Sequence, residues 1–167
     1  MQSKKAQFSH GDFIIGFVIF SFTLVLFFKY SDYVSPSQDN NEFLLREGKL
    51  ITDSLLSQGY PNDWTTGNVI IIGITNDNSV INNTKLLNLI SMDYSDTRTV
   101  FKIRSEYYLY FIDKNNSIIM INGTTDGFGY PGINTSNFDL IDAEDIAKTT
   151  RLAILDSEMI KMAVLTW

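Results

Sequence analysis

The sequence predicts an α+β protein, with an N-terminal membrane-spanning helix and then a small extracytoplasmic head that holds a second helix and antiparallel β-hairpins. Three observations carry this prediction. Residues 13–28 contain no charged side chain, apolar residues recur at helical spacing from Phe43 to Leu55, and two pairs of β-rich stretches flank short polar turns. Apolar residues at helical spacing predict an amphipathic helix, and apolar runs on both sides of a polar turn predict a hairpin.

The composition of the 167 residues argues against several classes of protein. Charged residues make up 19% of the chain, and the formal net charge is −6 with 13 Lys and Arg, so the chain has no electrostatic footprint for nucleic acid. The absence of cysteine removes disulfides, thiol nucleophiles and thiolate metal ligands. The single histidine, His10, lies before the head and cannot orient a catalytic triad there. We therefore expect no enzyme activity, no metal and no cofactor.

The apolar segment Phe13–Phe28 reads FIIGFVIFSFTLVLFF. Its sixteen residues fall just short of the roughly 17–25 that a spanning helix uses. Tyr30 and Tyr33 have amphipathic rings that settle at a headgroup interface, and Lys29 can extend its amine toward the headgroups. The alternative is a buried core helix of a soluble protein, but a domain of this size rarely surrounds a helix that is apolar on every side.

Flanking charges predict the orientation of this segment. Lys4 and Lys5 precede it, whereas Lys29 on the far side is offset by Asp32. The positive-inside bias therefore places the N-terminus in the cytoplasm and residues 36–167 outside the cell membrane. No small-x-small cleavage site follows the apolar run, so we expect it to stay in the mature protein as a single-pass anchor.

The residues before the apolar segment read KKAQFS over 4–9, and Asp12 then opens the Phe/Ile-rich helix. This pattern, over about residues 4–30, resembles the class III (prepilin-type) signal peptide of archaeal type IV pilins and archaellins. In that family a prepilin peptidase cuts on the cytoplasmic side, before the apolar segment. The resemblance implies cleavage between Ala6 and Gln7, with leader recognition through Lys4, Lys5 and Ser9.

The acidic residue of this signal departs by one position from the family pattern. The family usually has Glu five residues into the mature chain, where this sequence has Gly11, and the acid is Asp12. In assembled pilins the comparable acid meets the freed amino group of a neighbouring subunit. The alternative is that Asp12 is an interfacial N-cap, where its charge complements the helix dipole. Both interpretations stay open at this point.

The resemblance implies a leader over 1–6, a hydrophobic transmembrane and assembly helix over 7–35, and an extracytoplasmic head over 36–167. It further implies a pilin-like structural subunit of a type IV-like cell-surface filament, with a role in adhesion and with the helix at the filament core. Its partners would be the membrane lipid bilayer, the prepilin peptidase and other pilin-like subunits. The alternatives are an uncleaved single-pass protein that displays a small binding module and, less favoured, a surface enzyme. We assign subunit assembly to Asp12, Phe13, Phe17 and Phe20.

In the first part of the head the sequence predicts a broken helix. Pro36 interrupts the helical pattern, because the residue before proline avoids the α conformation. Residues 39–42 read as a capping box that restarts a helix, and residues 59–61 end it. The expected apolar stripe consists of Phe43, Leu44, Ile51 and Leu55.

The remaining elements follow from local pattern. Val69–Ile74 predicts a buried strand, and Thr84–Met92 predicts a helix capped by Asn83 or Thr84. Ser95–Lys102 favours a short helix. The later predicted elements are a hairpin of Glu106–Asp113 with Ser117–Ile121, a glycine-rich loop over Gly123–Gly132, a helical turn over Ala143–Thr149, and a hairpin of Leu152–Leu155 with Met159–Leu165.

Two further patterns bear on function. Gly127–Gly132 matches G-x-G-x-x-G, but Pro131 removes a backbone donor and no helical pattern follows, so we interpret it as a surface loop. Asn-x-Ser/Thr sequons on predicted loops or turns are candidate glycosylation sites if the head faces outward. They begin at Asn82, Asn115, Asn122 and Asn134.

Overall fold

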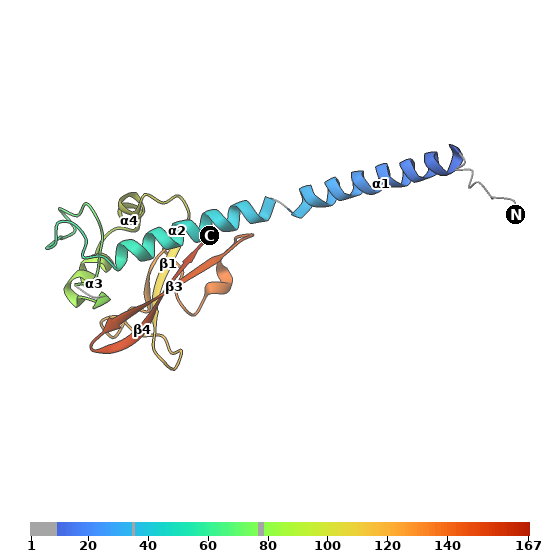
Figure 1. The fold of residues 1–167 in the computed structure, drawn as a ribbon. Coiled ribbons are helices and arrows are strands. Elements are labelled where there is room, and N and C mark those ends of the chain that lie inside the picture. Colours follow the sequence, from blue (N-terminus) through green and yellow to red (C-terminus); the bar gives the residue numbers. More distant parts are fainter. Residues whose placement is uncertain (1–9, 35, 77–78) are drawn as a thin grey trace, which may run out of the picture. The chain divides into compact units, whose positions relative to one another are not determined.

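The computed structural model describes residues 10–34, 36–76 and 79–167, and the side chains of residues 11–30, 40–76 and 79–167. Over these residues the protein is α+β, with four α-helices and one four-stranded antiparallel sheet (Figure 1). The chain divides into two compact units, residues 1–39 and residues 40–167.

The N-terminal unit contains helix α1, His10–Val34. This confirms a helix through the uncharged run of residues 13–28. Every described side chain from Gly11 to Tyr30 is exposed, apart from the half-buried Ser21. By length and composition Gly11–Tyr30 is long and apolar enough to cross a membrane. The structure is therefore compatible with a single-pass membrane protein.

Helix α2, Pro36–Leu55, begins earlier than the sequence predicted. The capping box at residues 39–42 lies inside the helix, because proline is tolerated at the first helical position. Leu44, Ile51 and Leu55 are buried, as the predicted stripe requires, but Phe43 at the edge of that stripe is exposed. The apolar face of α2 is thus narrower than the sequence pattern indicates.

The sheet contains β1 Tyr107–Ile112, β2 Gly127–Gly129, β3 Ala147–Leu155 and β4 Glu158–Thr166, in the order β2-β1-β4-β3. All neighbouring strands are antiparallel. The β3–β4 hairpin confirms the second predicted hairpin. Its two turn residues, Asp156 and Ser157, have φ values of 50° and 67°. Positive φ values at both turn residues are typical of a type I′ turn, whose backbone twist matches the twist of the paired strands.

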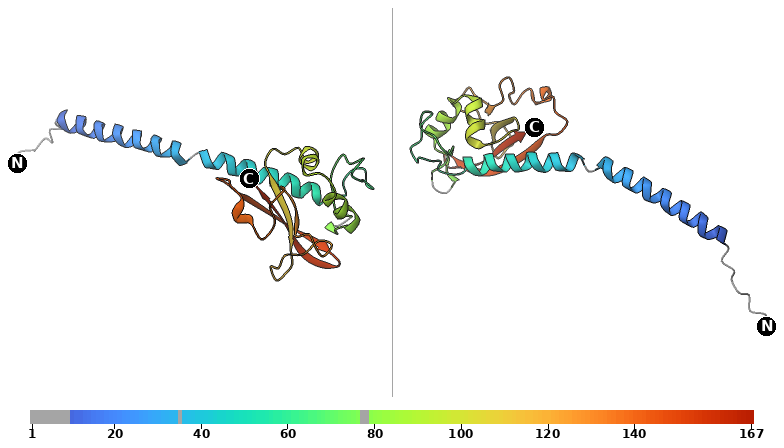
Figure 2. Two further views of the ribbon diagram at one scale, coloured as in Figure 1. Left: turned by 180° about the vertical axis from the view of Figure 1, so that it is seen from behind. Right: turned by 90° about the horizontal axis from the view of Figure 1, so that it is seen from above.

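Both faces of the sheet are covered, at least along β1. The odd-numbered side chains from Tyr107 to Phe111 join the main core, to which α2, α3 (Asn83–Ile90) and α4 (Tyr94–Phe101) contribute (Figure 2). The even-numbered side chains from Tyr108 to Ile112 pack with Ile133, Phe138 and Ile141 on the other face. The aromatic residues of β1 therefore point to both faces, as strand geometry requires.

Helices α3 and α4 confirm the two short helices that the sequence predicted. The cap of α3 is different from the prediction. Asn82, rather than Asn83 or Thr84, is the N-cap, and its side-chain oxygen accepts hydrogen bonds from the backbone N–H groups of Thr84 and Lys85. The cap is therefore one residue earlier than the nearer of the two predicted.

The strand predicted at Val69–Ile74 does not form. This segment makes only an isolated bridge between Tyr60 and Ile71, although Ile72 and Ile74 are fully buried. Its backbone instead bonds to the end of α2, since the N–H of Ile74 donates to the carbonyl of Leu55 at 2.8 Å. Only the second half of the apolar run is buried, since Ile70 and Ile71 are 63% and 47% exposed, and the run has no ladder of hydrogen bonds to a neighbouring strand.

The first predicted hairpin and its neighbours also differ. Beyond the turn after β1, Ile118 makes an isolated bridge to Ile112 and the N–H of Ile119 donates to the carbonyl of Phe111 at 2.9 Å, in place of the predicted strand. The two strands that pair with β1 are β4 and β2, and β2 lies inside the predicted glycine-rich loop. A Cβ at Gly129 would lie 2.2 Å from the carbonyl oxygen of Tyr107, so glycine permits this pairing. The helical turn predicted at Ala143–Thr149 is wrong, because β3 begins at Ala147.

Gly48 marks the closest approach of α2 to the sheet. A Cβ at this position would lie 2.6 Å from Oγ1 of Thr149 on β3 and 3.5 Å from Oγ1 of Thr166 on β4. The Thr166 hydroxyl donates to the carbonyl of Leu44, one turn earlier in α2, at 3.0 Å. The absence of a side chain therefore sets the distance at which α2 packs on β3 and β4.

We predict that Gly48→Ala destabilises the head by about 1–3 kcal/mol, because the new methyl group overpacks the interface. Helix propensity alone would favour alanine by about 1 kcal/mol, so the two effects have opposite signs. Thr149→Ala in the same chain removes the clashing hydroxyl, which is buried without a hydrogen-bond partner, and should restore most of the loss. Urea unfolding measures both, with Gly67→Ala, where a Cβ meets nothing within 4 Å, as the control.

Candidate functional site

The predicted cleavage and recognition residues Lys4, Lys5, Ala6, Gln7 and Ser9 lie outside the described residues. The four residues assigned to subunit assembly lie on α1. Asp12 is in its first turn, and Phe13, Phe17 and Phe20 are 73%, 62% and 63% exposed. Their spacing of four and three residues places the three rings on one helix face. The structure thus brings an acid and an aromatic stripe together near the start of α1.

The side chain of Thr23 in α1 finds its hydrogen-bond partner within the helix itself. The hydroxyl of Thr23 donates to the carbonyl of Ile19, four residues earlier, at 2.9 Å. Such a bond lets a hydroxyl enter an apolar medium without an outside partner. Between Phe13 and Phe28 the helix therefore offers an apolar surface without a charge.

The asparagine side chains of the four sequons differ in their exposure and in their hydrogen bonds. Asn115, Asn122 and Asn134 have exposed side chains on turns or loops. Asn82 instead caps α3 through its oxygen, and its amide nitrogen donates to Asn76 at 3.1 Å. A sugar attached to that nitrogen would compete with this contact. The amide nitrogen of Asn115 also donates, to Asp113 at 3.5 Å, so the geometry favours Asn122 and Asn134 as acceptors.

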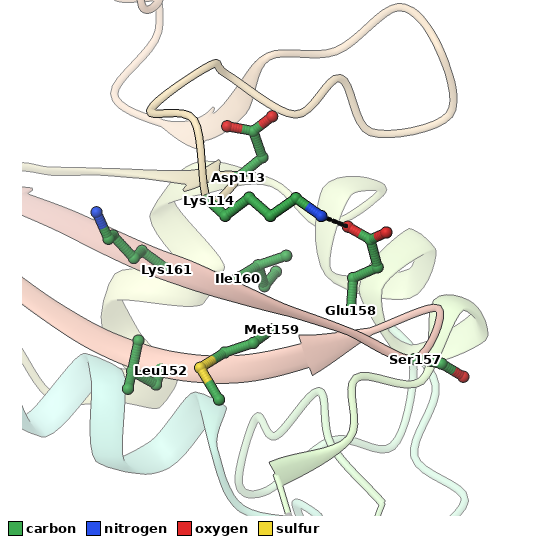
Figure 3. A pocket seen from close by; sticks show the side chains of 8 residues that line it. All are labelled: Asp113, Lys114, Leu152, Ser157, Glu158, Met159, Ile160 and Lys161. Atoms are coloured by element: carbon green, nitrogen blue, oxygen red, sulfur yellow. Dashed lines mark ion pairs between the residues drawn. The ribbon is translucent and has the colours of Figure 1, made fainter.

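A groove of about 500 Å³ lies at the turn end of the β3–β4 hairpin (Figure 3). Leu152 and Met159 give it an apolar wall, and Lys114 and Glu158 form an ion pair of 3.8 Å at its rim. Lys161 donates to the side-chain oxygen of Asn116 at 2.9 Å. The groove could hold a small amphipathic group, but its charged residues already have partners.

Asp113, which also lines this groove, is committed to its own turn. Its carboxylate accepts hydrogen bonds from the backbone N–H groups of Asn115 and Ser117 at 2.7 and 2.8 Å. Among the described residues no group of three or more His, Cys, Asp or Glu side chains is arranged to hold a metal ion.

Two buried charged residues that the sequence analysis did not single out fix loops of the head. The Glu47 carboxylate of α2 accepts hydrogen bonds from the backbone N–H groups of Arg104 and Ser105, at 3.0 and 2.8 Å. The Lys85 ammonium of α3 donates to the carbonyls of Gln58 and Thr75 at 2.8 and 3.3 Å. Neither residue type is usually buried, and no local pattern marks the distant partners.

A third polar cluster joins α4 to the start of β1. Glu106 accepts hydrogen bonds from the Tyr94 hydroxyl and, at 2.8 Å, from Arg98. Burial, together with the hydrogen bond to Glu106, raises the pKa of the Tyr94 hydroxyl above its usual range. The ring of Tyr94 also packs edge-on against Tyr130, which in turn contacts Trp167. These residues close one end of the sheet.

Asp126 anchors the segment that covers the second face of the sheet. Its carboxylate accepts hydrogen bonds from Thr135 N and Oγ1 at 2.7 and 2.6 Å and from the Tyr108 hydroxyl at 2.8 Å. Burial opposes the charged form, but these hydrogen bonds outweigh it and lower the pKa of Asp126. Burial and the bond to Asp126 raise the pKa of Tyr108.

Comparisons of the chain with protein-family models, with curated proteins and with solved structures gave no match.

We predict that Asp126→Asn destabilises the head by about 1–3 kcal/mol at pH 7, because the hydrogen bonds of the charged acceptor are lost. A carboxyl with a lowered pKa in the folded state contributes stability above its ordinary value near 3.8, and this contribution disappears as the pH falls through the folded pKa. The difference between the two proteins should therefore shrink below about pH 4. Urea unfolding from pH 7 to pH 2 checks this, with exposed Asp139→Asn as the control.

Proposed function

We propose that this protein is a pilin-like structural subunit, anchored in the cell membrane and incorporated into a type IV-like surface filament after cleavage between Ala6 and Gln7. The observation that carries the proposal is α1. From Phe13 to Phe28 it has no charge, and nearly every described side chain along it is exposed. A surface of this kind requires an apolar environment outside the chain itself.

A lipid bilayer and a bundle of neighbouring helices both meet this requirement. In a bilayer the helix satisfies its own backbone groups, as a spanning segment must. In a bundle its side chains pack against other helices, and Gly16, Ser21 and Thr23 permit close approach. The same helix can therefore serve first as an anchor and then as part of a filament core.

The proposed topology has the N-terminus in the cytoplasm and the head outside, because the lysine pair precedes the helix. The head suits a structural role, since α2 packs on the sheet and the polar clusters hold its loops. With the head outside, exposed Asn115, Asn122 and Asn134 would be accessible for glycosylation. Adhesion would be a property of the assembled filament.

One observation favours the alternative, an uncleaved single-pass protein that displays a binding module. The groove beside Leu152 and Met159 has room for a small ligand. The leader pattern separates the two proposals, because an uncleaved anchor has no use for the KKAQFS sequence.

We predict that coexpression with a prepilin peptidase in membranes yields a product whose intact mass corresponds to Gln7–Trp167. Ala6→Asp should abolish this processing, because the small residue before the cut is replaced by a charged one. Intact-mass spectrometry of the membrane fraction gives the result, and an inactive peptidase is the control. A full-length product beside an active peptidase would contradict the pilin-like proposal and leave the tethered binding module.

Asp12 provides a second prediction within the same proposal. If its carboxylate meets the freed amino group of a neighbour, Asp12→Ala should be cleaved normally but lost from sheared filaments, whereas Asp12→Glu should be retained. A carboxylate at a membrane interface is costly unless it is paired, so the pairing explains its presence. The helix α1 already includes His10, so Asp12 lies in its first turn and is not the N-cap. Equal recovery of Asp12→Ala and the unmodified chain in filaments would limit the role of Asp12 to its interaction with the helix dipole.

A further inference from the structure

One side of α2 carries a surface that is both basic and apolar. Phe43 and Leu50 are 39% and 48% exposed, and exposed Arg46 lies between them. Exposed Lys102 and Arg104 come from the segment that joins α4 to β1. We call these five residues the basic surface.

The basic surface has one part on α2 and one part on the segment that joins α4 to β1, and Glu47 connects them. Glu47 belongs to the same side of α2 as Phe43 and Leu50, because positions four and three residues apart are neighbours on a helix. Its carboxylate accepts hydrogen bonds from the backbone N–H of Arg104 at 3.0 and 3.1 Å, which fixes this segment against α2. None of the surface's three cations forms an ion pair with a described side chain. Glu42, one turn before Arg46, is the acid that borders the surface.

The segment before β3 carries a surface of the opposite charge. Asp139, Asp142 and Glu144 are exposed, and so are Leu140 and Ile146, at 64% and 45%. We call these five residues the acidic surface. The segment is held in place by Asp145, whose carboxylate accepts hydrogen bonds from Asn40 and Asn41 at 2.9 and 3.4 Å.

The two surfaces lie on opposite sides of α2. Gly48 places α2 over β3 and β4. The acidic surface leads directly into β3, whereas the basic surface leads into β1, and β4 separates these strands in the sheet. In Figure 1 and the left view of Figure 2, α4 lies above α2, and the short orange helix at residues 138–140 lies below it.

We propose that the basic surface of one head binds the acidic surface of a second copy of this chain. The two surfaces match in chemistry, because each combines three charges of one sign with two exposed apolar side chains. Complementary charges fix the register of an interface and disfavour the wrong pairing, in which like surfaces meet. This inference rests on the proposed filament function and names the contact between its heads.

Because the two surfaces lie on different parts of the head, their contact determines the symmetry of the assembly. A contact between two different surfaces is heterologous, so a bound pair still has one basic and one acidic surface free, and the chain of contacts stays open unless the rotation closes it. A twofold contact between identical surfaces would instead close after two copies. The heterologous contact allows every copy to send its N-terminal helix into the same membrane or filament core.

The absence of cysteine in the chain allows a direct test by disulfide cross-linking. Two full-length variants with different tags, Leu50→Cys and Leu140→Cys, are coexpressed in membranes with the prepilin peptidase and mildly oxidised. Both positions are exposed, so the fold should tolerate the changes. We expect a disulfide-linked dimer that carries both tags, and little product from either variant alone. Leu152→Cys, exposed but outside both surfaces, replaces Leu140→Cys in the control.

Charge reversal separates a specific contact from random collision. Arg46→Glu with Arg104→Glu, or Asp142→Lys with Glu144→Lys, should each reduce the mixed dimer at least tenfold. A chain with all four changes exchanges the two charges and should recover it. Circular dichroism of each purified variant establishes that the head is folded. Salt should weaken the contact, because exposed charges are screened.

The outcomes separate this inference from the proposed function. Cross-linking is measured in the membrane fraction whether or not the leader is cleaved and filaments form. If the leader is cleaved and filaments form but no mixed dimer appears, the head contact alone is overturned. The same holds if the yield of the mixed dimer is unchanged by the charge reversals. A full-length product would overturn the filament proposal, and the dimer would then report contact between anchored heads.

Discussion

The packing of α2 against β3 and β4 is the constraint on which the rest of the head depends. It requires a residue without a side chain at Gly48, where a Cβ would meet Thr149. The same approach brings Leu44 within hydrogen-bond distance of Thr166 and buries Ile51 and Leu55 in the core. Because α2 follows α1 in the chain, this interface also joins the apolar segment to the sheet. A force applied through the N-terminal segment would therefore reach the head as a load on α2.

Buried charge in the head serves to hold loops rather than to form ion pairs. The Glu47 carboxylate and the Lys85 ammonium each bond to main-chain groups of distant segments. A buried charge is tolerated when its hydrogen-bonding capacity is met, and a main-chain partner cannot be lost by substitution of another side chain. The exposed charges differ, because Arg46, Arg104 and the acids of residues 139–144 are oriented toward solvent. This division leaves the surface charges available for contacts between molecules.

The sequence predicted the elements whose signal is local. The uncharged run to Phe28, the spacing within α2 and the two-residue turn at Asp156 specify their structures over a few neighbouring residues. Prediction failed where a distant partner decides the conformation. Val69–Ile74 has the β-branched composition of a strand, yet among the described residues it makes only a bridge to Tyr60. The strand β2 was missed because its glycines reflect close contact with β1. The candidate site divides in the same way, since the apolar helix α1 could be predicted from the sequence whereas the loop contacts of Glu47 could not.

In the proposed assembly, helix α1 and the head contribute in physically different ways. An apolar helix is held in a bilayer or a bundle by forces that are largely non-directional, so α1 by itself defines a location but not a neighbour. The aromatic stripe at Phe13 and Phe17 allows many packings of similar energy. Charges that are set in register on a folded head discriminate between neighbours. In the proposed assembly, a subunit with a permissive helix and a selective head would therefore take its defined geometry from the contacts of the head.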